Sequence, residues 1–196
     1  MIVTCAFFFI AIVAIATSTD MTKSKPSEWK KAETARWLAH ENIFGTIATI
    51  SLHLNGAPFA QPKSFVDGTI ANSTGVLYFY DSDMDTSIQD IQANNFVSFA
   101  LTEATLLGHC NAKIRDPESP VCARVTFNGK FIPVEDEDEI AFAKEALFER
   151  HPSMATWPEE HEFRVHKIEL SDIWLIDVYG GASVISIEDY YSVTVN

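Results

Sequence analysis

The spacing of apolar residues after position 43 predicts two strands joined by a turn. Residues 43–54 are rich in β-branched side chains and partly alternate between apolar and polar, which is typical of a strand. Asn55-Gly56 follows directly, and this dipeptide favours a hairpin turn because both residues tolerate a positive φ angle. Pro58 and Pro62 cannot donate backbone hydrogen bonds, so the returning strand is expected to be irregular or to lie at a sheet edge.

Short runs with the same strand-like character recur through the rest of the chain. A second hairpin is predicted at 122–134, where two such runs flank Asn128-Gly129. Gly180-Gly181 interrupts the pattern near the C-terminus. The remaining predicted strands are 76–80, 96–101, 162–169, 172–178 and 184–185.

Three segments show the 3.6-residue period of a helix instead. The first is predicted at 27–41 with Ser27 as its N-cap. One face of this helix holds Trp29, Ala32, Trp37 and Leu38. A short helix is predicted at 85–93. The third helix follows the five carboxylates 135–139, which suit a helix N-terminus because they complement its dipole, and Pro152 should end it.

The order of these elements predicts the fold class. Strands that follow one another through short turns favour an antiparallel sheet that closes into a barrel over a doubly wound parallel sheet. The predicted fold is therefore mainly β, with helices flanking a barrel, and the length of the chain suits one domain, at 28–196.

The first 16 residues carry no charged side chain and are predicted to be a secretory signal peptide. The apolar run 6–15 has the length of a signal-peptide core, and Ala14-Ile15-Ala16 supplies a small-x-small cleavage pattern. A buried core helix and a membrane anchor are the alternatives, although a bilayer span needs about 20 apolar residues. Residues 17–27 are expected to form a flexible polar leader.

The charge of the chain limits its partners. The 14 Lys and Arg residues against 27 Asp and Glu give a formal net charge of −13 at pH 7. Binding to nucleic acid or to an anionic membrane surface depends on clustered cations, so this balance argues against both. We expect no membrane insertion once the signal peptide is removed.

Secretion would change how the cysteines are interpreted. Cys5 leaves with the signal peptide, and Cys110 and Cys122 remain as an even pair in an oxidising compartment, which favours one disulfide. Closing a loop of this length stabilises a fold by about 3 kcal/mol. Two separate buried thiols are the alternative. Secretion also makes Asn72, in the sequon Asn72-Ser73-Thr74, a candidate for N-glycosylation.

Motifs that carry catalytic or metal chemistry are weak in this sequence. His109-Cys110 and the pair His161 and His166 lack the spacing of a zinc site, and a disulfide would remove the thiolate that a Cys–His pair needs. A calcium site at 135–139 is the alternative to a solvated helix start, but EF-hand spacing is absent. We therefore predict no metal and no catalytic residue.

One segment is more particular. In 147–161 a helix exit is rich in aromatic residues and prolines, and His151 and His161 flank Trp157. A structural corner or an interaction surface is the favoured interpretation of this segment, and a catalytic acid–base pair of histidines is the alternative.

Several long motifs together span nearly the whole chain after the leader. They are Ala35-Arg36-x3-His40 leading to 45–51, then 76–80, 110–122, 147–161, 173–181 and 188–191. Through these motifs the chain resembles the CREG family, secreted or lysosomal glycoproteins first named as cellular repressors of viral early-gene-stimulated transcription. The resemblance implies a six-stranded antiparallel barrel like the FMN-binding split barrel of pyridoxamine-phosphate oxidases, and a homodimer.

The resemblance also implies that no flavin is bound. In flavin-binding relatives, Arg and Lys between a strand and a short helix clamp the FMN phosphate. The corresponding segment here, 80–88, has Thr86 and Ser87 at the clamp positions and holds three carboxylates and no cation. A phosphate would meet repulsion there rather than charge-assisted hydrogen bonds. The C-terminal sequon typical of the family is lost at Ser192, so Asn72 alone would carry a glycan.

These observations leave three hypotheses. The first is a non-enzymatic glycoprotein, secreted or lysosomal, that binds a cell-surface or endolysosomal receptor or another protein partner, with the growth, differentiation or endolysosomal role that the family implies. The second is an FMN- or haem-binding oxidoreductase, which rests on architecture alone. The third is an intracellular or nuclear regulator, as the family's name suggests, which the acidic charge and the secretory start oppose.

Overall fold

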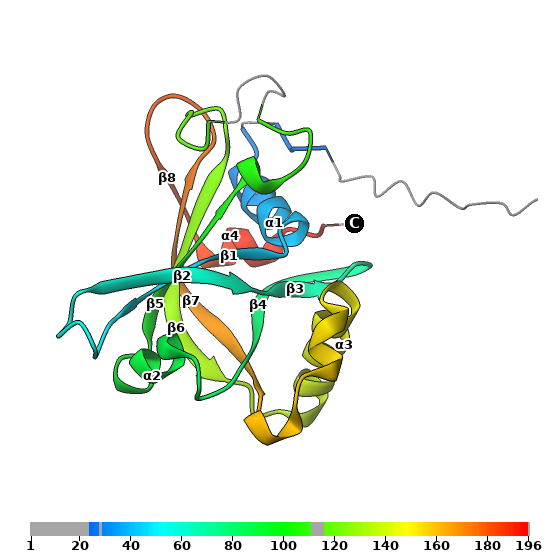
Figure 1. Ribbon diagram of the computed structural model, residues 1–196. Helices are drawn as coiled ribbons and strands as arrows, with labels where there is room; N and C mark the ends of the chain where they lie inside the picture. Colours follow the sequence, from blue (N-terminus) through cyan, green and yellow to red (C-terminus); the bar gives the residue numbers. More distant parts are fainter. Residues whose placement is uncertain (1–23, 28, 111–115, 196) are drawn as a thin grey trace, which may run out of the picture.

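The computed structural model describes residues 24–27, 29–110 and 116–195 (Figure 1). The predicted signal peptide, 1–16, lies outside the described residues, as does most of the predicted leader. Within the described part, a single curled antiparallel sheet is flanked by helices, which confirms the predicted mainly β, barrel-like fold.

The sheet contains eight strands in its described part, rather than six. Its order is β2-β1-β5-β6-β7-β4-β3, and β8 pairs with β7. The edge position predicted for the proline-containing return strand is confirmed, because β2 ends this order. The strands are β1 (Phe44–Ile50), β2 (Pro58–Ser64), β3 (Val66–Thr69), β4 (Asn72–Asp81), β5 (Phe96–Thr102), β6 (Arg124–Pro133), β7 (Arg164–Ile176) and β8 (Ser183–Ile185).

The helices cover different parts of the sheet. They are α1 (Lys31–Glu41), α2 (Thr86–Ala93), α3 (Glu137–Arg150) and α4 (Ile187–Ser192), with short 3-10 turns at Glu103–Thr105, Pro152–Thr156 and Glu159–His161. In Figure 1, α1 and α4 lie together just above β3, and α2 lies near the lower end of the sheet. The third helix, α3, stands beside β3 and β4.

Two apolar clusters hold these layers together. The larger one fills the concave side of the sheet, where the ring of Phe99 lies 5.0 Å from that of Phe65 and 5.1 Å from that of Phe79. The smaller one joins the other side of β3 and β4 to α3 through Val66, Tyr78 and Leu147. Aromatic pairs at these distances stabilise a core beyond the area that they bury.

The predicted hairpin at 122–134 is wrong. Strand β6 runs straight through Asn128-Gly129, and the register against β7 shifts there, so that Ser171 of β7 is the extra residue of a β-bulge. The carbonyl oxygen of Glu169 lies 2.1 Å from where a Cβ on Gly129 would be, so the glycine permits close strand approach rather than a turn. The same bulge shifts the apolar phase of β7, which explains why one strand was predicted as two.

The first hairpin has its turn where the sequence predicted it. Asn55 and Gly56 have φ angles of 55° and 89°. The preceding strand is shorter than predicted, because β1 ends at Ile50 and the residues that follow form the turn. Strand β3 was not predicted as a separate strand.

The start of α1 also differs from the prediction. Ser27 does not cap the helix, because its carbonyl accepts a hydrogen bond from the amide of Lys30 in a separate turn, and Lys30 is the N-cap. Trp29 therefore precedes the helix and is 85% exposed instead of facing the core. The predictions for α2 and α3 are confirmed, with Asp136 capping the acidic start of α3.

Candidate functional site

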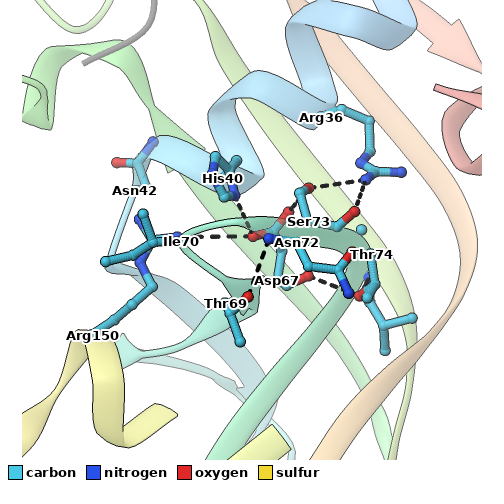
Figure 2. Close-up of polar contacts among 12 residues, drawn as sticks. Arg36, His40, Asn42, Asp67, Thr69, Ile70, Asn72, Ser73, Thr74 and Arg150 are labelled. Atoms are coloured by element: carbon cyan, nitrogen blue, oxygen red, sulfur yellow. Dashed lines mark hydrogen bonds and ion pairs between the residues drawn. The ribbon is translucent and has the colours of Figure 1, made fainter. Parts of the chain in front are cut away.

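A buried cluster of charged side chains surrounds Asp67 of β3 (Figure 2). The Nδ1 atom of His40, in the last turn of α1, lies 2.9 Å from one carboxylate oxygen of Asp67. Ser73 of β4 donates its hydroxyl to the other oxygen. The guanidinium of Arg150, at the end of α3, lies 3.9 Å from the carboxylate. Three elements therefore converge on one buried charge and compensate it.

Arg36 closes the cluster on the side of α1. Its Nη2 donates to the carbonyl oxygen of Ser73 at 3.0 Å and to the hydroxyl oxygen at 2.9 Å. The guanidinium also lies 5.3 Å from the ring centroid of Tyr190, in cation–π range. A Cβ on Gly75 would lie 2.7 Å from this guanidinium, so only glycine leaves room for the buried cation.

The order of contacts in the cluster does not suit nucleophilic catalysis. A catalytic triad needs histidine between the hydroxyl and the carboxylate, so that the imidazole takes the hydroxyl proton. Here Asp67 is the central member and contacts both Ser73 and His40. The carboxylate orients the two side chains and joins elements of the fold.

The candidate glycosylation residue lies at the tip that this cluster anchors. Asn72 is exposed at the start of β4, and its backbone N–H donates to the hydroxyl of Thr69 at 3.1 Å. The hydroxyl of Thr74 donates to the carbonyl of Asp67 at 2.8 Å and accepts from the amide of Val76 at 3.1 Å. The sequon backbone is therefore fixed while the asparagine faces solvent.

A second polar cluster lies at the N-terminus of α2, in the segment predicted to reject a phosphate. Asp85 caps the helix, and its Oδ1 accepts hydrogen bonds from the amide of Ser87 at 2.7 Å and from its hydroxyl at 2.6 Å. Gln61 of β2 donates to the same oxygen at 2.7 Å. Lys63 of β2 places Nζ 2.8 Å from Oδ2. The donors that could hold an anion are thus engaged by one carboxylate of the chain itself.

The position of Lys63 corrects the expectation that this site holds carboxylates and no cation. Segment 80–88 contains no cation, but β2 delivers one to it, and Nζ of Lys63 also lies 2.6 Å from Asp81. The lysine is 6% exposed and paired with two carboxylates. Repulsion alone therefore does not describe the site, because a buried cation is present and already neutralised.

The two carboxylates of this cluster respond to it in opposite ways. Burial raises the pKa of Asp81 to about 6, although the Lys63 cation opposes the shift. Burial also acts against ionisation of Asp85, but hydrogen bonds from Lys63 and Ser87 outweigh it and lower its pKa to about 2. Asp85 is therefore the carboxylate that stays charged at every physiological pH.

A cavity of 490 Å³ lies between α2 and the ends of β6 and β7. Ile88, Ile91 and Phe131 supply apolar walls, and His166 stacks on Phe131 at 5.1 Å. Burial lowers the pKa of His166 to about 4, so its ring is neutral. Asp83 and Arg164 also line the cavity, so its walls are partly apolar and partly charged.

The structure joins Cys110 and Cys122 in a disulfide, with 4.9 Å between their Cα atoms. The Glu103 carboxylate lies against it and accepts a hydrogen bond from the amide of Ala123 at 2.9 Å. With both sulfurs joined, the thiolates that zinc binding or Cys–His chemistry would use are absent.

The two histidines of the 147–161 segment have different neighbours and do not form a pair. The Nε2 atom of His151 lies 3.1 Å from the carbonyl of Phe65, and burial lowers its pKa. The ring of His161 lies instead 6.0 Å from that of Phe163. Trp157 is exposed, at 36%, and packs against aromatic neighbours.

Asp67 and Lys63 were not predicted from the sequence to be members of polar clusters. The spacing of Arg36 and His40 was one usable signal, because residues four apart share a face of a helix. No comparable local signal marks Lys63, whose partner Asp85 lies on another element.

The chain was compared with known proteins. A family model described as CREG, beta-barrel matches residues 26–192. Protein CREG2 of Homo sapiens is 41% identical over 169 residues, which are 85% of this chain and 57% of that protein. Protein CREG1 of Gallus gallus is 36% identical over 94% of this chain and 96% of its own length.

Solved structures share the fold at lower identity. A heme binding protein from Mycobacterium smegmatis superposes with a TM-score of 0.65 at 21% identity, covering 87% of this chain and 62% of that chain. Campylobacter jejuni ChuZ gives a TM-score of 0.60 at 15% identity and covers 86% of this chain and 63% of its own. At these identities the likeness shows the fold and carries no argument about ligands.

Proposed function

The chain belongs to the CREG β-barrel family, and on that premise we propose that it is a non-enzymatic glycoprotein that acts by binding a receptor or another protein. The observation that carries this proposal is that the central carboxylate of each charged cluster is bound by the chain's own groups. Asp67 is engaged by His40 and Ser73, and the donors around Asp85 are engaged by its carboxylate. Within these clusters no histidine is placed to take the proton of a serine hydroxyl, and the donors at the start of α2 are occupied.

The placement of Asn72 supports the glycoprotein part of the proposal. The asparagine is exposed at a hairpin tip whose backbone is held by Thr69 and Thr74. A glycan at this tip would extend into solvent without disturbing the buried cluster beneath it.

The outward face of the sheet supports a homodimer as a further part of the proposal. Directly paired residues share a face of a sheet, and one such row crosses five strands without a charge. The row is Thr46, Ala100, Thr126, Trp174 and Val184. Two copies that each carry a formal net charge of −13 repel one another, and a contact through this charge-free row adds no further repulsion.

The destination we propose is secretion or the lysosome. This rests on the apolar start at 1–16, the disulfide between Cys110 and Cys122, and the exposed sequon. Among the helices of the described residues, none combines the length and the apolarity needed to cross a membrane.

The test uses native protein secreted by cells. We expect a colourless preparation, no change in the spectrum of added FMN or hemin, an N-terminus near Thr17, and one glycan that an N-glycanase removes. Thr74→Ala should abolish the glycan, whereas Thr74→Ser keeps the sequon and should keep the glycan. A bound flavin or haem, or an unprocessed chain without glycan, would overturn the proposal.

A further inference from the structure

A second cavity, of 400 Å³, lies beside the connection between α3 and β7. We call it the corner pocket, and its walls come from three parts of the chain. Strand β4 supplies Tyr80, α3 supplies Lys144 and Phe148, and the connection supplies Trp157, Glu159, Glu162 and Phe163, among others.

Aromatic rings line the corner pocket. The rings of Trp157 and Phe163 each stack on Tyr80, with centroids 6.0 Å and 5.2 Å away, and they lie 4.7 Å from each other. Phe148 meets Tyr80 edge-on at 5.5 Å. The faces of such rings are electron-rich, so a pocket lined with them attracts a cation.

The charges around the rings favour a cation as well. Glu159 and Glu162 both line the pocket. Burial raises the pKa of the Tyr80 hydroxyl, and the charge of Glu159 adds to the shift, so this carboxylate acts on the ring. An anionic ligand would meet these two carboxylates and the large negative charge of the whole chain.

The protein already places one cation of its own at these rings. Lys144, one helical turn before Phe148, holds Nζ 5.9 Å from the ring centroid of Tyr80. This contact places a primary ammonium group in cation–π range of the ring, and it identifies the group that an incoming cation would displace.

We propose that the corner pocket binds a lysine or arginine side chain presented by a basic segment of a partner protein. The aromatic faces bind the charged head, and the two carboxylates pair with it at the rim. This inference deepens the proposed function, on which it rests, because it gives the chemistry of one partner and the surface that receives it.

The proposal is tested by calorimetric titration of the intact secreted protein with a short lysine–glycine peptide. The comparison peptide carries Nε-acetylated lysines, which keep their length and lose their charge. We expect binding of the first peptide, about tenfold or greater loss on acetylation, and weaker binding as salt rises.

Substitutions in the pocket separate recognition from simple folding effects. Trp157→Leu should weaken binding about tenfold, equivalent to about 1.4 kcal/mol and within the range of a cation–π contact. Glu159→Gln should weaken it several-fold. Lys144→Met should strengthen it several-fold, because it removes the competing internal ammonium group, and loss of stability would not produce that gain.

The matched control is Trp29→Leu, which removes another exposed tryptophan, just before α1, and should leave the affinity unchanged. Equal binding of the acetylated peptide, binding of neutral oligosaccharides in place of the lysine peptide, or dissociation of a dimer by Trp157→Leu would overturn the proposal. If the lysine peptide does not bind, the protein can still be colourless and glycosylated, so the corner-pocket proposal can fail while the proposed function holds.

Discussion

Asp81 and Asp85 lie four residues apart, and their pKa values are shifted in opposite directions. Asp81 is buried with one oxygen on Lys63, and its Oδ2 has no hydrogen-bond partner among the described residues. Asp85 is half-exposed and accepts four hydrogen bonds. Desolvation therefore dominates the pKa of Asp81, whereas hydrogen-bond donors dominate that of Asp85.

Comparing the stability of Asp81→Asn with that of wild type across pH should measure the cost of desolvating the Asp81 carboxylate. The folded-state pKa of about 6 lies above the ordinary value of 3.8, so the native state disfavours ionisation and wild-type stability falls as pH rises between these values. The variant cannot ionise. Its free energy of unfolding relative to wild type should rise by about 3 kcal/mol from about pH 4 to pH 7, measured by urea denaturation.

Asp85→Asn provides the comparison of opposite sign. Because the pKa of Asp85 is lowered to about 2, wild type gains stability as pH rises from about 2 to 4. This variant should therefore lose stability relative to wild type over that interval. A parallel pH dependence for both variants would contradict the assignment of the two roles.

Among single residues, those whose partners are near in sequence could be predicted, and those whose partners lie on other elements could not. The start of the short helix at Asp85 was predicted, because helix starts are decided by neighbours along the chain, and the structure makes Asp85 its N-cap. Lys63 was missed because its charge reaches Asp85 from an adjacent element, 22 positions away in sequence. Asp67 likewise gains its partners from α1, β4 and α3, which only the folded chain brings together.

At the scale of elements, two Asn-Gly dipeptides with the same local signal have different structures. Asn55-Gly56 forms a turn with positive φ angles. Asn128-Gly129 lies inside β6, because β5 and β7 pair with it on both sides and outweigh the local preference for a turn. Tertiary pairing therefore decided the fold where the sequence signal was equal.

Substituting alanine at Gly129 should therefore destabilise the fold more than the same substitution at Gly56. Gly56→Ala has nothing within 4 Å of the new Cβ and only the strain of a positive φ angle, so it should cost about 1 kcal/mol. Gly129→Ala places Cβ against the Glu169 carbonyl oxygen and must push strands apart, at a cost of about 3 kcal/mol. Thermal unfolding of both variants checks the ranking, and an equal loss would contradict the bulge.

At the scale of the whole molecule, the charge-free row across the sheet is the feature that favours self-association. Thr126 lies near its middle, between Ala100 and Trp174 in register. The composition gave the net charge, and the helix and strand periods gave the fold class. The row itself could not be predicted, because it depends on the registers of five strands and on a bulge that the pattern did not reveal.

Thr126→Lys should dissociate the proposed dimer, because the two-fold axis of such a dimer brings the new charges of both copies into one desolvated face. Light scattering coupled to gel filtration should then report the mass of one chain. Ala141→Lys, which adds the same charge on the exposed side of α3, should remain dimeric. A wild-type protein that is itself monomeric at high concentration would contradict the dimer.

The length of β7 has a consequence for the order in which the molecule opens. Its 13 residues pair with β6 along most of the strand, with β4 at one end and with β8 at the other. Its amides can therefore meet solvent only when several neighbours separate together, whereas β2 lies at an edge. In heavy water the centre of β7 should be the last part to exchange its amide protons for deuterium, so the strand that the sequence pattern divided in two forms the most persistent unit of the fold.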